Sequence, residues 1–278
     1  MKKLAVIVLA VSIGIPAAFA GQSAAGSPLP AAPNVITQHG VGEAFLFPVA
    51  GSVEGVNGTH FRSEVSLVNF KHEPQELLVE FLPQNATQPT TIRLTIDARR
   101  FEFWNDFVAT MMSRPGTLGA LTFRAVMPGT TVTDTTAQLN AFSRIWTPQP
   151  GTNGTSSMSM SAIDATGLSA IGNEAAYVIG HRQDAQYRVN VGIVNLASVD
   201  RVFLVEPTNS FPTNPAPSFS VTVPARSMQQ VAMPEGFFAA LVFRITPATA
   251  GAWTAYAATV DNFSGDGWIS KAQYSTRR

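Results

Sequence analysis

The sequence carries one pattern twice and in the same order, and this internal duplication restricts the possible folds more than any other feature. Each copy holds an arginine-containing strand pattern that ends in asparagine, then a Thr-x-x-Ala-Arg segment, then an Ala-Leu-x-Phe-Arg segment. The matched segments are residues 61–70 and 187–196, 95–99 and 222–226, and 120–124 and 240–244. Three matches in one order are hard to obtain by chance, so the sequence predicts two copies of a domain-sized unit.

Within each copy, apolar residues alternate with polar ones. Val65 and Leu67 share one face of their segment, as do Val191 and Ile193 in the second copy, which is the period of a β-strand. About seven short strands in roughly a hundred residues is typical of a β-sandwich. We therefore expect an all-β fold of two tandem immunoglobulin-like or jelly-roll-like β-sandwich domains, at residues 40–165 and 172–278. The Ser-, Ala- and Gly-rich stretch Ser156–Asn173 is the expected join.

The strands themselves are predicted from short runs of β-branched and aromatic residues between Gly, Pro, Asn or Asp turns. The runs are Ala44–Val49, Ser63–Asn69, Leu77–Leu82, Thr91–Ile96, Gly119–Val126, Gln138–Trp146, Ala175–Ile179, Val189–Asn195, Arg201–Val205, Ser218–Val223, Met228–Met233, Phe238–Ile245 and Trp253–Val260. One short helix is expected within Asn105–Met112. The prolines Pro83, Pro89, Pro207, Pro212, Pro215 and Pro217 are expected between strands, where a missing amide donor does no harm.

The first twenty residues have the order of a secretory signal peptide. Lys2 and Lys3 precede the apolar run Leu4–Ile15, and Ala18-Phe19-Ala20 forms a small-x-small cleavage site between Ala20 and Gly21. We expect residues 1–20 to be removed and the mature chain to be secreted or periplasmic. The chain has no cysteine, so we expect neither a lipoprotein anchor nor disulfide bonds.

Residues 21–39 follow the cleavage site and are rich in Ala, Pro, Gly and Ser at their start. Such a composition buries little apolar surface, so a flexible leader is expected. No later apolar run approaches the length that spans a bilayer, so no transmembrane segment is expected in the mature chain. The formal charge is zero and only 13% of residues are charged. Nucleic-acid binding is not expected, because it requires a basic excess.

Two hairpin sequences resemble a known module. Residues 55–62 (GVNGTHFR), followed by an alternating strand that ends in Val68-Asn69, and residues 259–266 (TVDNFSGD) are similar to the opening and the closing hairpin of a tandem β-sandwich module of secreted bacterial proteins. Residues 143–152 are similar to the closing hairpin in the first copy. The module occurs alone or appended to extracellular proteases. The resemblance implies fold and compartment and carries no catalytic residue.

Motifs for catalysis are missing from the sequence. There is no Gly-x-Ser-x-Gly elbow, no His pair with zinc spacing and no phosphate-binding loop. The four histidines, His39, His60, His72 and His181, are spread along the chain and are interpreted as solvated loop residues. We therefore expect no enzyme activity, no catalytic residue and no resident cofactor.

Calcium is the one cofactor for which the sequence offers a candidate site. Asn262, Ser264 and Asp266 place oxygen donors at alternate positions, as at the start of a calcium loop. The twelfth position, which requires a bidentate Glu, is Gln273. A Gly-rich hairpin explains the same residues, since Asn, Asp and Gly tolerate positive φ.

Trp146 and Trp268 are the candidate ligand-binding residues, because both border Gly-, Pro- or Asn-rich loops and an exposed indole can stack on a sugar ring. The partner would be an unknown extracellular glycan or protein. The recurring arginine pairs, which could form an anion site, are interpreted as scaffold residues; they are Arg62 and Arg188, Arg99 and Arg226, and Arg124 and Arg244. Asn69 and Asn195 are expected to bind turn backbone groups.

The sequence therefore predicts a non-enzymatic exported protein with an adhesion, scaffolding or surface- and ligand-binding role. A carbohydrate-active or other extracellular hydrolase, with a site built from scattered carboxylates, is the first alternative. An outer-membrane β-barrel is a further alternative, which would need longer alternating strands than these.

Overall fold

The computed structural model describes residues 42–149, 151–168, 172–209 and 216–274. The predicted signal peptide, its Ala20–Gly21 cleavage site, the leader and His39 lie outside these residues. In chain order, the elements are β1 (Ala44–Glu54), a 3-10 turn (Val56–Gly58), β2 (His60–Asn69), β3 (Gln75–Pro83), β4 (Thr90–Ile96), β5 (Phe101–Trp104), α1 (Phe107–Thr110), β6 (Thr117–Val126), β7 (Leu139–Pro148), β8 (Thr155–Ser161), β9 (Ile163–Asp164), β10 (Ala176–Gln183), β11 (Tyr187–Asn195), β12 (Arg201–Asn209), β13 (Phe219–Val223), β14 (Ser227–Ala232), β15 (Phe238–Pro247), β16 (Trp253–Asp261), β17 (Gly267–Lys271) and β18 (Gln273–Tyr274).

The protein is nearly all β, as predicted, and every predicted strand overlaps an observed one. The expected helix is present as the single turn α1. It begins after Asp106, whose carboxylate accepts a hydrogen bond from the Ala109 amide at 3.1 Å. This capping contact satisfies an amide that a helix start leaves without a partner.

The expected join at Ser156–Asn173 is wrong over its first part. Residues 155–161 form β8, which pairs along its whole length with β7. Met158 and Met160 are buried while Ser157, Ser159 and Ser161 are not. The high serine content of this segment is typical of a linker. Its methionines nevertheless occupy alternate positions, as the buried face of a strand requires.

The expectation that Pro83 and Pro207 lie between strands is also wrong, and Pro212 and Pro215 lie outside the described residues. Pro83 is the last residue of β3 and lies opposite Gly119 of β6. Pro207 is inside β12, opposite Phe243 of β15. On the other side of β12, the pairing with β13 ends at Val205. Pro207 therefore lies where one side of β12 no longer has a paired strand, a place where a residue without an amide donor is tolerated.

The strands of the first half form one continuous antiparallel sheet in the order β4-β3-β6-β1-β2-β7-β8, with β5 paired to β2 and β9 to β1. β1 connects two groups of strands within this sheet. Its first part pairs with β6 and β9, and its last three residues pair with β2. The register shifts between Phe47 and Ala50, on either side of Pro48, because proline cannot donate to the ladder.

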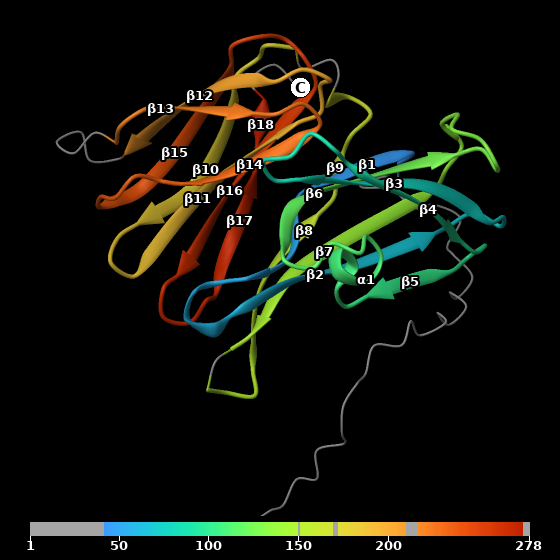
Figure 1. Cartoon of the computed structure of the whole chain (residues 1–278), viewed down its shortest axis with the longest axis horizontal. Helices are drawn as coiled ribbons and strands as arrows, with labels where there is room; N and C mark the ends of the chain where they lie inside the picture. The colour runs from blue at the N-terminus through green and yellow to red at the C-terminus, as the bar shows by residue number, and fades with distance from the viewer. Residues whose placement is uncertain (1–41, 150, 169–171, 210–215, 275–278) are drawn as a thin grey trace, which may run out of the picture.

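The second half has two antiparallel sheets, β13-β12-β15-β10-β18 and β14-β11-β16-β17. With strand numbers raised by nine, every pairing of the first half recurs here except that of β1 with β2. For example, β1 pairs with β6 and β9, and β10 pairs with β15 and β18. Figure 1 shows the two halves side by side, the first in blue to green and the second in yellow to red.

Two asparagines end equivalent strands in equivalent ways, as predicted. The Asn69 amide donates to the carbonyls of Glu73, Ile96 and Asp97, and its oxygen accepts from the Lys71 amide. Asn195 donates to Val199, Val223 and Pro224 and accepts from Ala197. Both side chains are fully buried.

The arginines at the following turns also match. Arg99 and Arg226 have φ values of 54° and 51°. Their guanidinium groups donate to the carbonyls of Phe70 and Leu196 at 3.0 and 3.2 Å. Both arginines cap loop carbonyls, which confirms their interpretation as scaffold residues.

The two halves share buried apolar surface. Leu46, Leu82 and Met158 of the first half belong to the core of the second half, where Phe203, Phe243 and Trp253 are fully buried. β16 is buried on both faces, since one face packs on its own half and the other faces the first half.

Polar contacts also join the halves. Arg226 forms an ion pair with Glu80, and Ser227 donates to the Pro83 carbonyl at 2.7 Å. No helix in the described ranges is long and apolar enough to cross a membrane.

Candidate functional site

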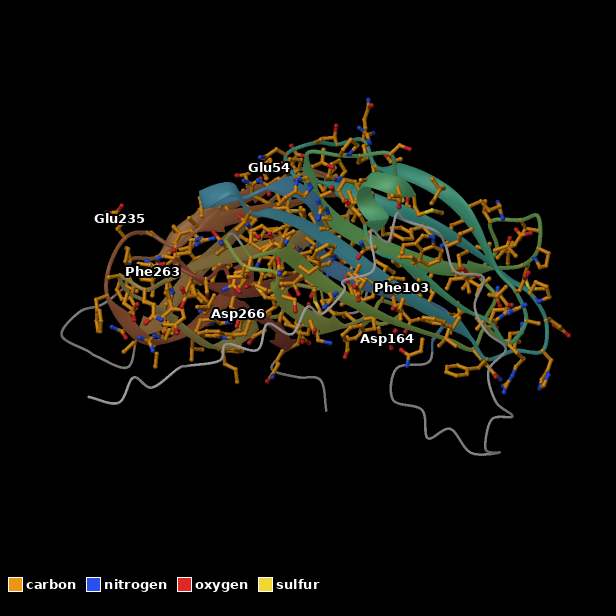
Figure 2. The ribbon with its side chains drawn as sticks, turned by 90° about the horizontal axis from the view of Figure 1, so that it is seen from below. Glu54, Phe103, Asp164, Glu235, Phe263 and Asp266 are labelled. Atoms are coloured by element: carbon orange, nitrogen blue, oxygen red, sulfur yellow. The ribbon has the colours of Figure 1, made fainter. Side chains whose placement is uncertain are left out.

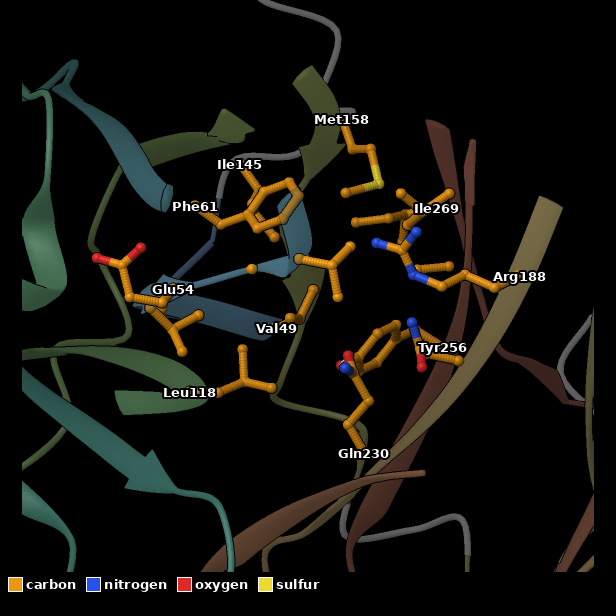
Figure 3. Close-up of a pocket in the computed structure, with 17 residues that line it drawn as sticks. Val49, Glu54, Phe61, Leu118, Ile145, Met158, Arg188, Gln230, Tyr256 and Ile269 are labelled. Carbon is orange, nitrogen blue, oxygen red and sulfur yellow. The ribbon is translucent and has the colours of Figure 1, made fainter. Parts of the chain in front are cut away.

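A cavity with a volume of about 260 Å³ lies between the two halves. One wall comes from β1, β2, β6, β7 and β8, and the other from β11, β14, β16 and β17. Figure 3 shows the side chains converging on this space. Its apolar lining residues include Val49, Val53, Leu118, Ile145, Met158 and Ile269, and its polar ones are Glu54, Arg188, Asn190 and Gln230, with the Tyr256 hydroxyl.

Strand alternation places these side chains. Val49, Gly51 and Val53 of β1 line the cavity, whereas Ala50 and Ser52 point to the other face. In the same way Tyr256, Ala258 and Val260 of β16 line it. In a β-strand, every second side chain points to the same side. The side chains that point to the cavity are mostly apolar, so both of its walls are mostly apolar.

Tyr256 forms the floor of the cavity and is held in one position. Its hydroxyl donates to Gln230 Oε1 at 2.6 Å, and its side chain is buried. The ring lies over Gly192, the residue opposite it on β11, where a Cβ atom would be 2.0 Å from a ring carbon. Burial raises the pKa of the Tyr256 hydroxyl well above its usual range, so the group stays a neutral donor.

Arg188 on β11 supplies the positive charge of the cavity. Its Nη1 donates to Asn262 Oδ1 at 2.8 Å, and burial lowers the pKa of the guanidinium. Arg188 also lines a second, more polar hollow of about 100 Å³, with Thr59, Gln149 and Ser264. The guanidinium therefore lies at the boundary between the mostly apolar cavity and the more polar hollow.

Trp146 lies in β7 and is half-buried. Its indole nitrogen donates to the Asn105 carbonyl at 3.1 Å. The guanidinium carbons of Arg62 and Arg144 lie 5.1 and 6.0 Å from the ring centroid. These cation–π contacts engage the ring within the protein, so the indole is not a freely exposed platform.

Trp268 lies in β17, on a different sheet from Trp146, and is also half-buried. Its nitrogen donates to the Gly180 carbonyl at 2.8 Å, and its ring is stacked with His181. The structure does not bring the two candidate tryptophans to the cavity, whose lining contains neither.

His181 is not a solvated loop residue as expected. It lies in β10, is 2% exposed, and its Nδ1 is 2.9 Å from Thr259 Oγ1. Burial lowers the pKa of its imidazole to about 4. His72 is exposed, in agreement with the expectation.

The calcium candidates Asn262, Ser264 and Asp266 form the hairpin between β16 and β17. The Asn262 side-chain oxygen accepts from Arg188, and the Asp261 carboxylate accepts from the amides of Phe263 and Ser264. The turn is thus closed by its own hydrogen bonds. Figure 2 shows Phe263 and Asp266 on the second half, far from Phe103 of the first. No group of three metal-ligating side chains occurs among the described residues.

A further cluster lies on the β1–β2 hairpin, where His60 is again not a loop residue. Its Nδ1 is 2.7 Å from Glu54 Oε1 and its Nε2 is 3.3 Å from Ser52 Oγ. This is the connectivity of a Ser–His–acid triad. However, Ser52 is 2% exposed and its hydroxyl donates to the Asp106 carboxylate at 2.8 Å.

A nucleophilic serine needs access to substrate and a hydrogen bond toward its base. The Ser52 hydroxyl has neither, and the cluster joins the hairpin to the start of α1.

Comparison of the chain with protein-family models, with curated proteins and with solved structures gives no match. The functional argument therefore depends on the geometry of the cavity.

Proposed function

We propose that this chain is an exported, non-enzymatic protein that binds a small ligand with an apolar body in the cavity between its two halves. The observation that carries the proposal is the cavity of about 260 Å³, lined by both halves. Ligand sites are commonly concave, mostly apolar and located between domains, with a few polar groups that set orientation. This cavity has all of these properties.

The size of the cavity supports the binding of a small ligand. An empty apolar cavity of about 150 Å³ can hold benzene, and this one is larger.

We also propose that the halves are tandem β-sandwich modules related by duplication. The recurrence of strand pairings, the paired asparagines and the arginines with positive φ support this proposal. The buried residues of each half lie between two groups of strands. The similarity to the module of secreted bacterial proteins stays a prediction, as do the adhesion and scaffolding roles.

Export is supported by the order of charged, apolar and small residues at positions 1–20. A hydrolase stays the alternative, and the Ser52–His60–Glu54 cluster is its best candidate. The hydrogen bond from Ser52 to Asp106 favours a structural role.

The proposal is tested by filling the cavity. Ala258 lines it and is 6% exposed, so Ala258→Leu would place three more carbons inside. Ala240 is exposed on β15, so Ala240→Leu is the matched control. Binding of indole, toluene and octanamide would be measured by calorimetry and by the shift in melting temperature.

We expect at least one compound to bind the mature wild-type protein and Ala240→Leu equally, and Ala258→Leu at least tenfold more weakly. A ligand at ten times its Kd stabilises the folded state by about 1.4 kcal/mol, which is readily measured. The proposal is wrong if no compound binds, or if Ala258→Leu binds as well as the wild type.

A further inference from the structure

The charges around the cavity are unequal, and this asymmetry identifies the class of ligand. Several arginines of this protein form an ion pair with a carboxylate, such as Arg93 with Glu76 and Arg244 with Glu206, both at 2.6 Å. Arg188 lines the cavity, and within the described residues no carboxylate lies within 4.0 Å of its guanidinium nitrogens.

The partner that Arg188 does have is a neutral amide. One nitrogen donates to Asn262 Oδ1, and no hydrogen bond is found for the others among the described residues. The side chain is half-buried. A guanidinium taken partly out of water loses hydration that one amide and the more distant charge of Asp261 replace only in part, because burial still lowers its pKa.

The surroundings of Arg188 fit an anion at the end of an apolar molecule. Figure 3 shows its guanidinium directed into the space between Met158, Ile269 and Tyr256. On the far side of Arg188 the polar hollow begins, and its polar lining residues include Thr59, Gln149, Ser264 and the acidic Asp261. An apolar body would therefore lie on the valine, leucine and isoleucine wall, with its head at the polar boundary.

The two nearby carboxylates have other hydrogen-bond partners, and Asp261 acts on Arg188 only through its charge, without an ion pair within 4.0 Å. Asp261 accepts from Gln186 and from two backbone amides of its own turn. Glu54 contacts His60 at 2.7 Å and its side chain is 75% exposed. Figure 3 shows the Glu54 carboxylate across the cavity from Arg188 and directed away from it.

We propose that the cavity binds amphipathic carboxylates, with the apolar body between the halves and the carboxylate paired to Arg188. This inference rests on the proposed function and adds the chemical class of the ligand. Guanidinium and carboxylate match in geometry and can form two parallel hydrogen bonds. The apolar body can be a short acyl chain or an aromatic ring, and the experiment separates these two.

The test compares acids with neutral amides of the same shape. The pairs are octanoate with octanamide, and 4-phenylbutyrate with 4-phenylbutyramide, at pH 7.5 with the full mature chain. The variants are Arg188→Gln, which removes the charge, and Arg188→Lys, which keeps the charge but cannot form the two parallel hydrogen bonds of a guanidinium. Arg93→Gln, at an arginine outside the cavity lining, is the control.

We expect at least one acid to bind wild type and Arg93→Gln about tenfold more tightly than its amide, the size of one charge-assisted hydrogen bond. Arg188→Gln should remove this preference while amide binding stays the same, and Arg188→Lys should keep part of it. Unchanged amide binding also shows that Arg188→Gln is folded.

Equal binding of acid and amide by the wild type would overturn the inference and leave the proposed function in place. A preference that survives in Arg188→Gln would overturn it as well. If neither acids nor amides bind, the proposed function fails and this inference with it. When one of the two acids binds more tightly than the other, its identity shows whether the apolar body is an acyl chain or an aromatic ring.

Discussion

Asn195 shows how one side chain can define a strand end. Its amide reaches three carbonyls of two separate turns, at 2.8 to 3.1 Å, and it is fully buried. The bond to the Val223 carbonyl is buried, and the bonds to the Val199 and Pro224 carbonyls are partly buried. Loss of the amide removes the side-chain donor from all three acceptors, and a buried acceptor without a donor costs about 1–3 kcal/mol.

We expect Asn195→Ala to lower the free energy of unfolding by about 2–3 kcal/mol because several such bonds are lost together. Asn153→Ala is the control, since Asn153 is exposed and surface changes usually stay within about 0.5 kcal/mol. Urea unfolding followed by fluorescence measures both. Equal stability of the two variants would contradict this role for Asn195.

The buried His181 makes stability depend on pH. In the unfolded chain its pKa is the ordinary 6.5, and in the folded protein burial lowers it to about 4. Below pH 6.5 the unfolded chain gains a proton that the folded protein does not take up. The free energy of unfolding therefore falls between about pH 6.5 and pH 4, by up to about 1.4 kcal/mol per pH unit.

We expect His181→Gln to flatten this pH dependence, because glutamine does not titrate. His72→Gln should leave the slope unchanged, since His72 is exposed. The measurement is urea unfolding in steps from pH 7.5 to pH 4.5. The same slope in His181→Gln as in the wild type would assign the effect to other groups.

At the scale of elements, the pairing of β11 with β16 depends on one close approach. Gly192 and Tyr256 are opposite each other, and a Cβ atom on residue 192 would overlap the buried ring. The ring cannot move without breaking its hydrogen bond to Gln230. We expect Gly192→Ala to destabilise the protein by about 1–3 kcal/mol, as overpacking of a core does.

The control for this prediction is Gly154→Ala. At Gly154 the nearest atoms to a new Cβ are side-chain oxygens at 3.4 Å, so little change is expected. Thermal unfolding compares the two variants with the wild type. A stable Gly192→Ala protein with native tyrosine fluorescence would show that the floor of the cavity can move.

The sequence predicted these elements well where apolar residues alternate in a β-branched run, as in β2 and β11. It failed at β8, where serine replaced the usual polar residues and methionine the usual apolar ones. It also missed β5, β9, β17 and β18, which have only two to five residues. Such short pieces hold too few residues to show a period.

The candidate site was much less predictable than the strands. The cavity is lined by residues as far apart as Val49, Leu118, Arg188 and Ile269. A sequence pattern marks Arg188, as one of the recurring arginines, whereas Val49, Leu118 and Ile269 each look like an ordinary strand residue in their own segments. Only the packing of one half on the other brings them together. Trp146 and Trp268 are candidates by their residue type, but their rings contact Arg62, Arg144 and His181 of the protein itself.

For the whole molecule, the shared core predicts cooperative unfolding. Leu46 and Leu82 of the first half are fully buried with the core of the second, and the Glu80–Arg226 pair and the Ser227–Pro83 bond cross between the halves. Unfolding either half would expose apolar surface of the other. We expect one calorimetric transition, with equal calorimetric and van't Hoff enthalpies.

Ser227→Ala tests the same coupling by a point change. It removes a buried bond between the halves and should lower the melting temperature while the transition stays single. Two resolved transitions in the wild-type protein would show that the halves are independent units.

A pocket shared between two parts of one chain separates two tasks. In the proposed binding mode, substitutions in β1 or β7 would reshape the side that contacts the apolar body, whereas substitutions in β11 would change how the carboxylate is recognised. Each side can then diverge while its counterpart keeps its role. A lineage of such proteins could acquire new cargo by revising one half at a time.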